Sequence, residues 1–400
     1  MTGCVNHLHT LDQAYTLKSS RWVFTDVNIV DVTHGEIITN MDVFVDDGVI
    51  NKIVKRDTKA TNGYQIIQAK DLFLSPGLID SHVHIYSERD LIFYVANGVT
   101  GVQNMWGFEG MMTLLGLPNS LDLKRRISNW GFGPMIWTSG PIFEGEKKTH
   151  PFMSSFIDKA SAEEEVERQQ QLRYDFIKTY DWLSNEAFSA IILKANAQNI
   201  PVKGHVPYSV SIHDAIESGL AEVEHLTGWI DIDSATINVA ENKLDEISIL
   251  ARNKNISVCP SLLVFRRVMS QERAEEELVN HSYRRYLSSI DKWMENQGAS
   301  SMRDNVKIPL ENYPDMIAEV QERVLLNLLK NNVNIVACTD AGNPFVYPGV
   351  SLHEEMSLLQ AAGISPDKIL QMATIKGQFN RSLLLILFYP KKILSKIFTI

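Results

Sequence analysis

The sequence predicts an α/β protein: a (β/α)8 TIM barrel with a small, incomplete β-sandwich domain formed by the N-terminal strands. Residues 21–74 contain short Val- and Ile-rich runs separated by turn signals. From 75 to 377, apolar strand-like runs alternate with helical patterns, which is typical of a barrel. No Gly-rich dinucleotide fingerprint follows any of these runs, and this disfavours the alternative, a doubly wound open sheet.

The order of these patterns divides the chain into four parts. We expect an N-terminal extension over 1–20, the small β domain over 21–74, the barrel over 75–377 and an atypical apolar tail over 378–400. A polar segment with a helical pattern, 266–320, follows the seventh barrel strand and is interpreted as a lid or rim insertion.

The individual strands follow from the apolar runs. In the small domain they are expected at 22–32, 42–54 and 64–74. In the barrel they are expected at 77–86, 99–106, 134–143, 174–181, 201–207, 221–227, 256–265 and 334–342.

The tail is unlike the rest of the chain. Its last part, "SLLLILFYPKKILSKIFTI" (382–400), is apolar and basic. It is short, and Pro390, Lys391 and Lys392 interrupt it, so it does not predict a helix that spans a membrane.

Composition narrows the class of partner. With 44% hydrophobic and 22% charged residues the chain can bury a large core. A formal net charge of −10 opposes general binding to nucleic acid or to an anionic membrane, because both require clustered positive charge. A small-molecule substrate is expected, and a homo-oligomer is compatible with the sequence.

The three cysteines, Cys4, Cys259 and Cys338, are far apart and lack the spacing of a zinc finger or a disulfide framework. Cys259 and Cys338 are interpreted as buried bystanders. "MTGC" (1–4) is similar to the end of a bacterial lipoprotein cleavage box, although no apolar signal segment precedes it. As written, the chain is expected to be cytoplasmic. If the true start lies upstream, Cys4 would carry a lipid anchor on a periplasmic or membrane-anchored lipoprotein.

Two histidines end the first barrel strand, in "LFLSPGLIDSHVHIY" (72–86). Residues i and i+2 of a strand point to the same side, so His82 and His84 would converge on one point, as metal ligands do. The spacing alone is weak evidence, since it also occurs at His7 and His9, where no strand precedes it.

Other ionisable residues lie on later barrel strands, where catalytic groups gather at the carboxyl ends. An unpaired ionisable group in an otherwise apolar strand is costly, so these residues call for a joint explanation. The full set is His82, His84, Lys178, His205, His225 and Asp340.

The motifs "PGLIDSHVH", "GVTGVQNMWG", "YDFIKTYD", "GHVP", "VEHLTGW" and "TDAGNPFVYPGVSLHEEM" occur in this order. Together they resemble the amidohydrolase superfamily, in its imidazolonepropionase-like and prolidase-like branch, over roughly residues 20 to 377. The resemblance implies a binuclear site with two divalent ions, usually zinc. It implies that His82, His84 and Asp340 hold one metal, that His205 and His225 hold the other, and that carboxylated Lys178 bridges them.

The activity implied is hydrolysis of a C–N bond, in an amide, a peptide or a cyclic amide, by a metal-activated hydroxide. Asp340 would take up the proton and pass it to the leaving nitrogen. A lactonase or phosphotriesterase-like esterase is the variant within this class. A catalytically impaired, truncated amidohydrolase is the alternative from another class, because the resemblance stops before the tail. The resemblance implies further strands there that would pair with the N-terminal strands, so we expect the sheet of the small domain to keep an unpaired edge, which would favour aggregation.

Four further residues have two interpretations each. His353 either orients a ligand or has an ordinary role in helix capping or at the surface. Trp106, Tyr208 and Trp229 either line the substrate pocket or pack under loops. If Lys178 were not the bridge, Asp175 or Asp181 would be the candidates.

Overall fold

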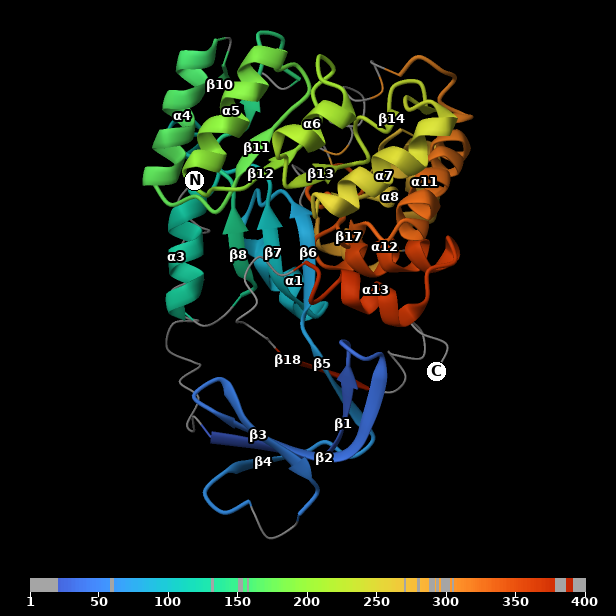
Figure 1. Cartoon of the computed structure of the whole chain (residues 1–400). Coiled ribbons are helices and arrows are strands. Elements are labelled where there is room, and N and C mark those ends of the chain that lie inside the picture. The colour runs from blue at the N-terminus through green and yellow to red at the C-terminus, as the bar shows by residue number, and fades with distance from the viewer. Residues whose placement is uncertain are drawn as a thin grey trace. The chain divides into compact units, whose positions relative to one another are not determined.

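The computed structural model describes residues 21–57, 61–130, 133–149, 154–156, 158–269, 271–278, 281–287, 292, 295, 303, 306–377 and 386–390. The expected N-terminal extension, with Cys4, lies outside this part of the chain, as do 378–385 and 391–400. The chain divides into two compact units, the first with the strands before residue 78 and the segment 386–390, the second beginning at Leu78. Figure 1 shows both units with their elements labelled.

The first unit is a six-stranded sheet in the order β18-β5-β1-β2-β3, with β4 also paired to β1. Its strands are β1 (Arg21–Asp31), β2 (Glu36–Asp46), β3 (Val49–Lys55), β4 (Gln65–Gln68), β5 (Leu72–Pro76) and β18 (Ile386–Pro390). Alternate residues of β1 turn inward, as the period of a strand requires. The buried core of the first unit consists of Val27, Val43, Ala69 and Leu74.

The C-terminal segment contributes a strand to this sheet, contrary to the prediction from its sequence. β18 runs antiparallel to β5, with Ile386 opposite Pro76 and Pro390 opposite Leu72. The reason is physical: "ILFYP" is apolar and aromatic, which suits a strand, and an exposed strand edge accepts any such segment that reaches it.

The second unit is a mixed α/β fold. It contains two parallel sheets, β6-β7-β8 and β10-β9-β11-β12-β13-β16-β17. The strands are β6 (Leu78–Val83), β7 (Val99–Asn104), β8 (Met135–Thr138), β9 (Phe143–Glu144), β10 (Ser154–Ser155), β11 (Ile177–Thr179), β12 (Val202–Gly204), β13 (Glu222–Glu224), β16 (Ser257–Cys259) and β17 (Asn334–Ile335). Each of the eight barrel strands expected from the sequence contains one of them. β14 (Ile230–Asp231) and β15 (Thr236–Ile237) form a separate antiparallel pair.

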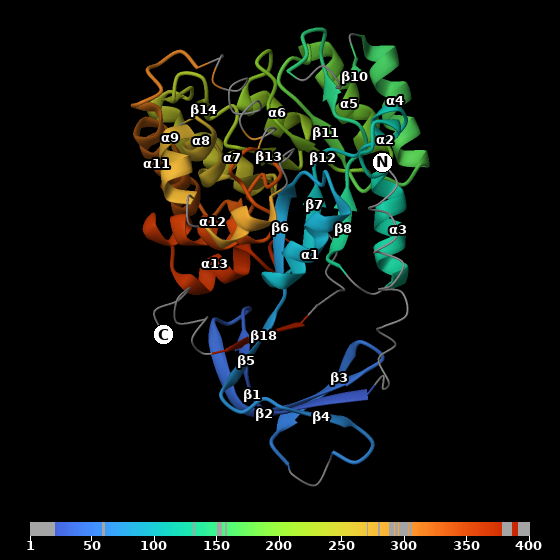
Figure 2. The same cartoon turned by 180° about the vertical axis from the view of Figure 1, so that it is seen from behind.

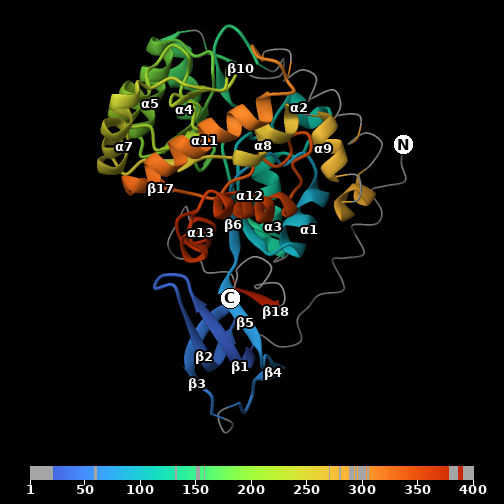
Figure 3. The same cartoon turned by 90° about the vertical axis from the view of Figure 1, so that its right-hand side faces the viewer.

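Helices lie outside these strands, as the rear and side views make clear (Figures 2 and 3). They are α1 (Glu88–Ala96), α2 (Met111–Leu114), α3 (Ser120–Trp130), α4 (Lys159–Gln171), α5 (Asn185–Ala197), α6 (Ile212–Ser218), α7 (Leu244–Asn253), α8 (Leu262–Val268), α9 (Gln271–Leu278), α11 (Tyr313–Lys330), α12 (Val350–Ala361) and α13 (Pro366–Met372), with 3-10 turns η2 (Glu241–Lys243) and η3 (Ser282–Tyr286).

Local sequence explains where several of these helices begin. At α1, Ser87 accepts a hydrogen bond from the backbone of Arg89 while Asp90 accepts one from the backbone of Ser87, which is a capping box. Ser184 and Ser211 are the N-caps of α5 and α6, where each side chain accepts a hydrogen bond from a backbone N–H of the first turn. Within the described residues, no helix is long and apolar enough to cross a membrane.

Candidate metal centre

Three predicted ligands meet at the carboxylate of Asp340. Its Oδ1 lies 3.0 Å from His84 Nε2 and 3.2 Å from His82 Nε2, and its Oδ2 lies 3.6 Å from His225 Nε2. All of these side chains are buried. Residues from the first, sixth and eighth predicted strands, up to 258 positions apart in sequence, therefore converge on one point.

His205 joins the same group through its ring. The centroid of its imidazole lies 4.9 Å from that of His225, and the His225 centroid lies 4.7 Å from that of His82. β12 can bring His205 this close because it ends in Gly204, at φ 146°; a Cβ there would lie 2.3 Å from the carbonyl oxygen of Thr179 on β11.

Lys178 is the sixth predicted ligand and lies in the middle of β11. Its side chain is fully buried, and its Nζ has no hydrogen-bond partner within the described part of the chain. Burial lowers the pKa of the ammonium, although the carboxylates of Glu224 and Asp340 oppose that shift. A buried amine that is easily deprotonated and unpartnered is suited to chemical modification.

The protonation states of the imidazoles fit metal binding. Burial lowers the pKa of His84, His205 and His225, so these rings are held neutral, which is the form that binds a metal. His82 differs. Burial and Lys178 lower its pKa, but Asp340 and Glu224 outweigh them and raise it.

The backbone is strained at two of the predicted ligands. His225 has φ 57° and Asp340 has φ 64°, both in the left-handed region that non-glycine residues rarely occupy. Such strain persists only where the surrounding structure imposes it, and it concentrates at functional sites.

Two carboxylates, the buried Glu224 and the partly exposed Asp181, contact the outer nitrogens of two of the histidines, and the sequence analysis did not assign either of them this role. Glu224 Oε2 lies 2.6 Å from His82 Nδ1, and Asp181 Oδ1 lies 2.7 Å from His205 Nδ1. The signal for Glu224 was present: "AEVEH" places two acids at alternate positions of an otherwise apolar strand, so both face the same side. Asp175, the other alternative to Lys178, instead pairs with Lys124 at 2.6 Å.

Asp340 is positioned through the residue before it. Asp80 accepts hydrogen bonds from the backbone N–H of Thr339 at 3.0 Å and from its hydroxyl at 2.6 Å. Burial raises the pKa of Asp80 to about 7, against the opposing effect of these hydrogen bonds. This acid, too, was not identified from the sequence.

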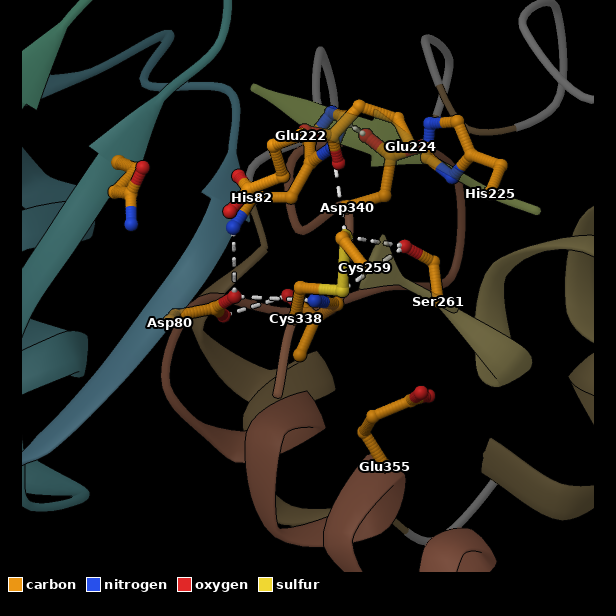
Figure 4. Close-up of a disulfide and its surroundings, with 12 residues drawn as sticks. Asp80, His82, Glu222, Glu224, His225, Cys259, Ser261, Cys338, Asp340 and Glu355 are labelled. Carbon is orange, nitrogen blue, oxygen red and sulfur yellow. Dashed lines mark hydrogen bonds and ion pairs between the residues drawn. A yellow bond between two sulfur atoms is a disulfide. The ribbon is translucent and has the colours of Figure 1, made fainter. Parts of the chain in front are cut away.

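Cys259 and Cys338 are not bystanders, and the earlier interpretation is wrong. They form a disulfide, with Cα atoms 5.8 Å apart, and lie 79 positions apart in sequence (Figure 4). β16 and the chain after β17 are neighbours, so the fold supplies the proximity that sequence spacing could not reveal. Cys259 Sγ also lies 3.9 Å from His82 Nδ1.

The remaining predicted residues fall in different places. Tyr208 is 57% exposed and lines the cavity beside the site, whereas Trp229 is fully buried. Trp106 is buried with its ring edge-on to His84, at a centroid distance of 6.3 Å. His353 Nε2 lies 2.7 Å from the carbonyl oxygen of Asn97, the residue that ends α1.

A cavity of about 1050 Å³ opens onto the site. His205, His225 and Asp340 form part of its wall, and Trp182 and Tyr208 stand together in it with ring centroids 4.7 Å apart. Lys147 lies over the Trp182 ring at 3.5 Å. The volume is sufficient for a small organic substrate next to the histidines.

The donor set fits a divalent metal. The ligand atoms of His82, His225 and Asp340 lie within 4.8 Å of one another. Imidazole nitrogens with a carboxylate oxygen are the ligands that zinc accepts in catalytic sites.

The sequence profile of the amidohydrolase family matches residues 73–379. The chain belongs to the amidohydrolase family. Family membership supports a hydrolase that acts on C–N bonds. No curated protein is a significant sequence match.

Solved structures resemble this amidohydrolase at low sequence identity. The bottromycin amidohydrolase is 21% identical with a TM-score of 0.73, over 96% of this chain and 84% of that chain. A Xaa-Pro dipeptidase with bound methionine is 15% identical with a TM-score of 0.66, over 94% and 96%. The ochratoxinase of A. niger is 16% identical with a TM-score of 0.63, over 95% and 91%. At these identities the likeness concerns the fold.

Proposed function

We propose that this amidohydrolase is a metal-dependent enzyme that hydrolyses a C–N bond of a small molecule, in an amide, a dipeptide, an N-acyl amino acid or a cyclic amide. The observation that carries the proposal is the convergence of the Nε2 atoms of His82, His84 and His225 on the Asp340 carboxylate. Buried imidazoles gathered around one carboxylate have little structural purpose without a cation.

The fold proposed for this chemistry is a closed (β/α)8 barrel over 75–377, and a small, incomplete β-sandwich domain is proposed over 21–74. Parallel bridges between Ser139 and Phe176 and between Val83 and Ala341 support closure, because they link both edges of the three-stranded sheet, at β8 and β6, to the seven-stranded sheet. The backbone N–H of Ser81 also donates to Ala337 at 3.0 Å. In such a barrel the carboxyl ends of the strands carry the active site.

The proposed ligand sets are two. His82, His84 and Asp340 hold one ion, and His205 and His225 hold the other, with zinc as the expected metal. Lys178 lies on β11 with its amine buried and unpartnered within the described residues, which supports its carboxylation. In that reaction the ammonium first loses a proton, and the neutral Nζ then attacks carbon dioxide. An N–C bond forms as a C–O π bond breaks, a second proton is released, and the side chain changes from a cation to an anion.

When bound, the metals would supply water activation near neutral pH and polarisation of the scissile carbonyl. Asp340 accepts the proton of the attacking water on its carboxylate and delivers it to the leaving nitrogen as the C–N bond breaks. Asp80, through Thr339, keeps the Asp340 carboxylate in place. The cavity walls, with Trp182 and Tyr208, hold the substrate and exclude bulk water.

The test combines metal analysis with a substrate screen. Purified protein should contain close to two zinc ions per chain after loading, and should hydrolyse members of a library of dipeptides and N-acyl amino acids. Lactones and phosphotriesters in the same screen test the esterase alternative. A folded chain that binds no divalent metal would refute the proposal and favour an impaired amidohydrolase.

A further inference from the structure

We propose that Glu224 is a positioning residue that fixes the tautomer and the orientation of His82, and that it sets the affinity of one metal of the pair. The inference rests on the proposed function, because it concerns how this chain holds its metals. Glu224 Oε2 lies 2.6 Å from His82 Nδ1, and both side chains are almost completely buried.

The tautomer follows from the chemistry of the two groups. A carboxylate can only accept a hydrogen bond, so in a neutral His82 ring the proton must lie on Nδ1. The lone pair is then on Nε2, which lies 3.2 Å from Asp340 Oδ1 on the side of the predicted metal. Without Glu224, a fraction of the rings would carry the proton on Nε2 and could not bind a metal there.

The position of Glu224 is itself fixed by the sheet. It lies opposite Cys259 in the parallel pairing of β13 with β16, and Cys259 is held by its disulfide to Cys338. Because Cys259 Sγ lies 3.9 Å from the same Nδ1 atom, the outer edge of the His82 ring faces both the carboxylate and the disulfide (Figure 4).

Within the described residues, only two of the four histidines have a carboxylate on Nδ1, so each carboxylate can be tested against a different metal. His205 has Asp181 on its Nδ1, whereas the Nδ1 atoms of His84 and His225 have no hydrogen-bond partner in the part of the chain that is described. Each proposed metal thus has one histidine held by a carboxylate. Removing Glu224 should weaken the metal of His82 and His84, and removing Asp181 should weaken the other.

Glu222 provides a matched control on the same strand. It lies two residues before Glu224, is also buried, and faces the same side of β13. Its carboxylate is paired with Lys203 Nζ at 2.8 Å instead of with a histidine. Glu222→Gln removes an equally buried charge, so it reports the loss of stability that any such change causes.

The experiment is a zinc titration of chelator-stripped protein against a chromophoric chelator, for wild type, Glu224→Gln, Asp181→Asn and Glu222→Gln. Outer carboxylates of metal-bound histidines typically contribute 10- to 100-fold in affinity. We expect Glu224→Gln to weaken one of the two zinc sites by about 10- to 100-fold and to alter the cobalt absorption spectrum. Asp181→Asn should weaken the other zinc site, and Glu222→Gln should keep both affinities while losing stability.

Two zinc affinities within about twofold of wild type in a folded Glu224→Gln protein would overturn the proposal. If this variant does not fold, nitrogen-15 spectra of the metal-free wild type decide the question, with the His82 ring identified by its absence from His82→Asn. In spectra recorded above the pKa of His82, where the ring is neutral, a protonated Nδ1 is expected, and a neutral ring protonated on Nε2 overturns the proposal. Failure of the wild type to bind zinc would instead refute the proposed function.

Discussion

Glu355 of α12 accepts a hydrogen bond from the backbone N–H of Leu262, the first residue of α8, at a distance of 2.8 Å. Its second oxygen accepts from the N–H of Leu263 at 2.9 Å. Both amides belong to the first turn of a helix that has no side-chain cap, so Glu355 satisfies two donors that would otherwise lack partners. The contact joins two helices that are 82 residues apart.

Glu355 should make stability depend on pH. Burial raises its pKa from the ordinary 4.5 to about 7, although both backbone hydrogen bonds oppose the shift. Between these values the folded chain holds a proton that the unfolded chain has lost, so stability falls as the pH rises. The free energy of unfolding of wild type relative to Glu355→Gln should fall by up to about 3 kcal/mol from pH 4.5 to 7. Denaturation at several pH values measures this difference, and a constant difference would contradict the prediction.

The disulfide between Cys259 and Cys338 should stabilise the fold substantially. It closes a loop of 79 residues, for which the loss of chain entropy in the unfolded state amounts to about 4 kcal/mol. Reduction by a phosphine, which does not bind zinc strongly, should therefore lower the denaturation midpoint. The double variant Cys259→Ser, Cys338→Ser should already be less stable and should not respond to the reductant. An equal response of both proteins would exclude this disulfide as the cause.

Asp340→Asn should separate proton transfer from metal binding. The amide keeps an oxygen near His82 and His84 but loses most of the basicity that proton transfer needs. Turnover should fall at least about 100-fold while a substantial share of the metal is retained. Asp214→Asn, on the exposed surface of α6, serves as the control and should keep normal turnover. Near-normal turnover of a metal-loaded Asp340→Asn protein would exclude Asp340 as the proton shuttle.

Carboxylation of Lys178 should make metal uptake depend on carbon dioxide. Metal-free protein in buffer depleted of carbon dioxide should take up zinc poorly, and bicarbonate should restore uptake. With carbon-13 bicarbonate, a carbamate signal should appear in wild type and be absent from Lys178→Ala. A short carboxylic acid should partly restore zinc binding to that variant. Two tightly bound zinc ions and full activity in Lys178→Ala would show that the lysine is not the bridge.

Deleting 382–400 should damage the first unit and spare the metal centre. The deletion removes β18 and exposes the edge of β5, so aggregation should begin at a lower temperature. Zinc uptake should persist, because the predicted ligands all lie between His82 and Asp340. A shorter deletion, 391–400, keeps β18 and should behave as wild type. Equal aggregation of the two deleted proteins would argue against a structural role for β18.

Several features of the fold and the site could be predicted from the sequence because they depend on neighbouring residues. The period of two in an apolar strand placed His82 and His84 on one side. Alternation of strands and helices indicated the α/β class. Barrel strands carry their functional groups at their carboxyl ends, and from this we predicted that His205, His225 and Asp340 share one site although they are distant in the chain.

Only the tertiary structure decided which of these distant side chains touch. Glu224 contacts His82 across 142 residues, and Cys259 reaches Cys338 across 79. β18 pairs with β5, and this pairing was not predicted from the sequence of either segment. Such contacts depend on the register between strands and on the curvature of the sheet, and local periodicity contains neither. The sequence by itself therefore determined the elements and the candidate ligands, and the packing of the strands determined the carboxylates, the disulfide and the strand pairing that support them.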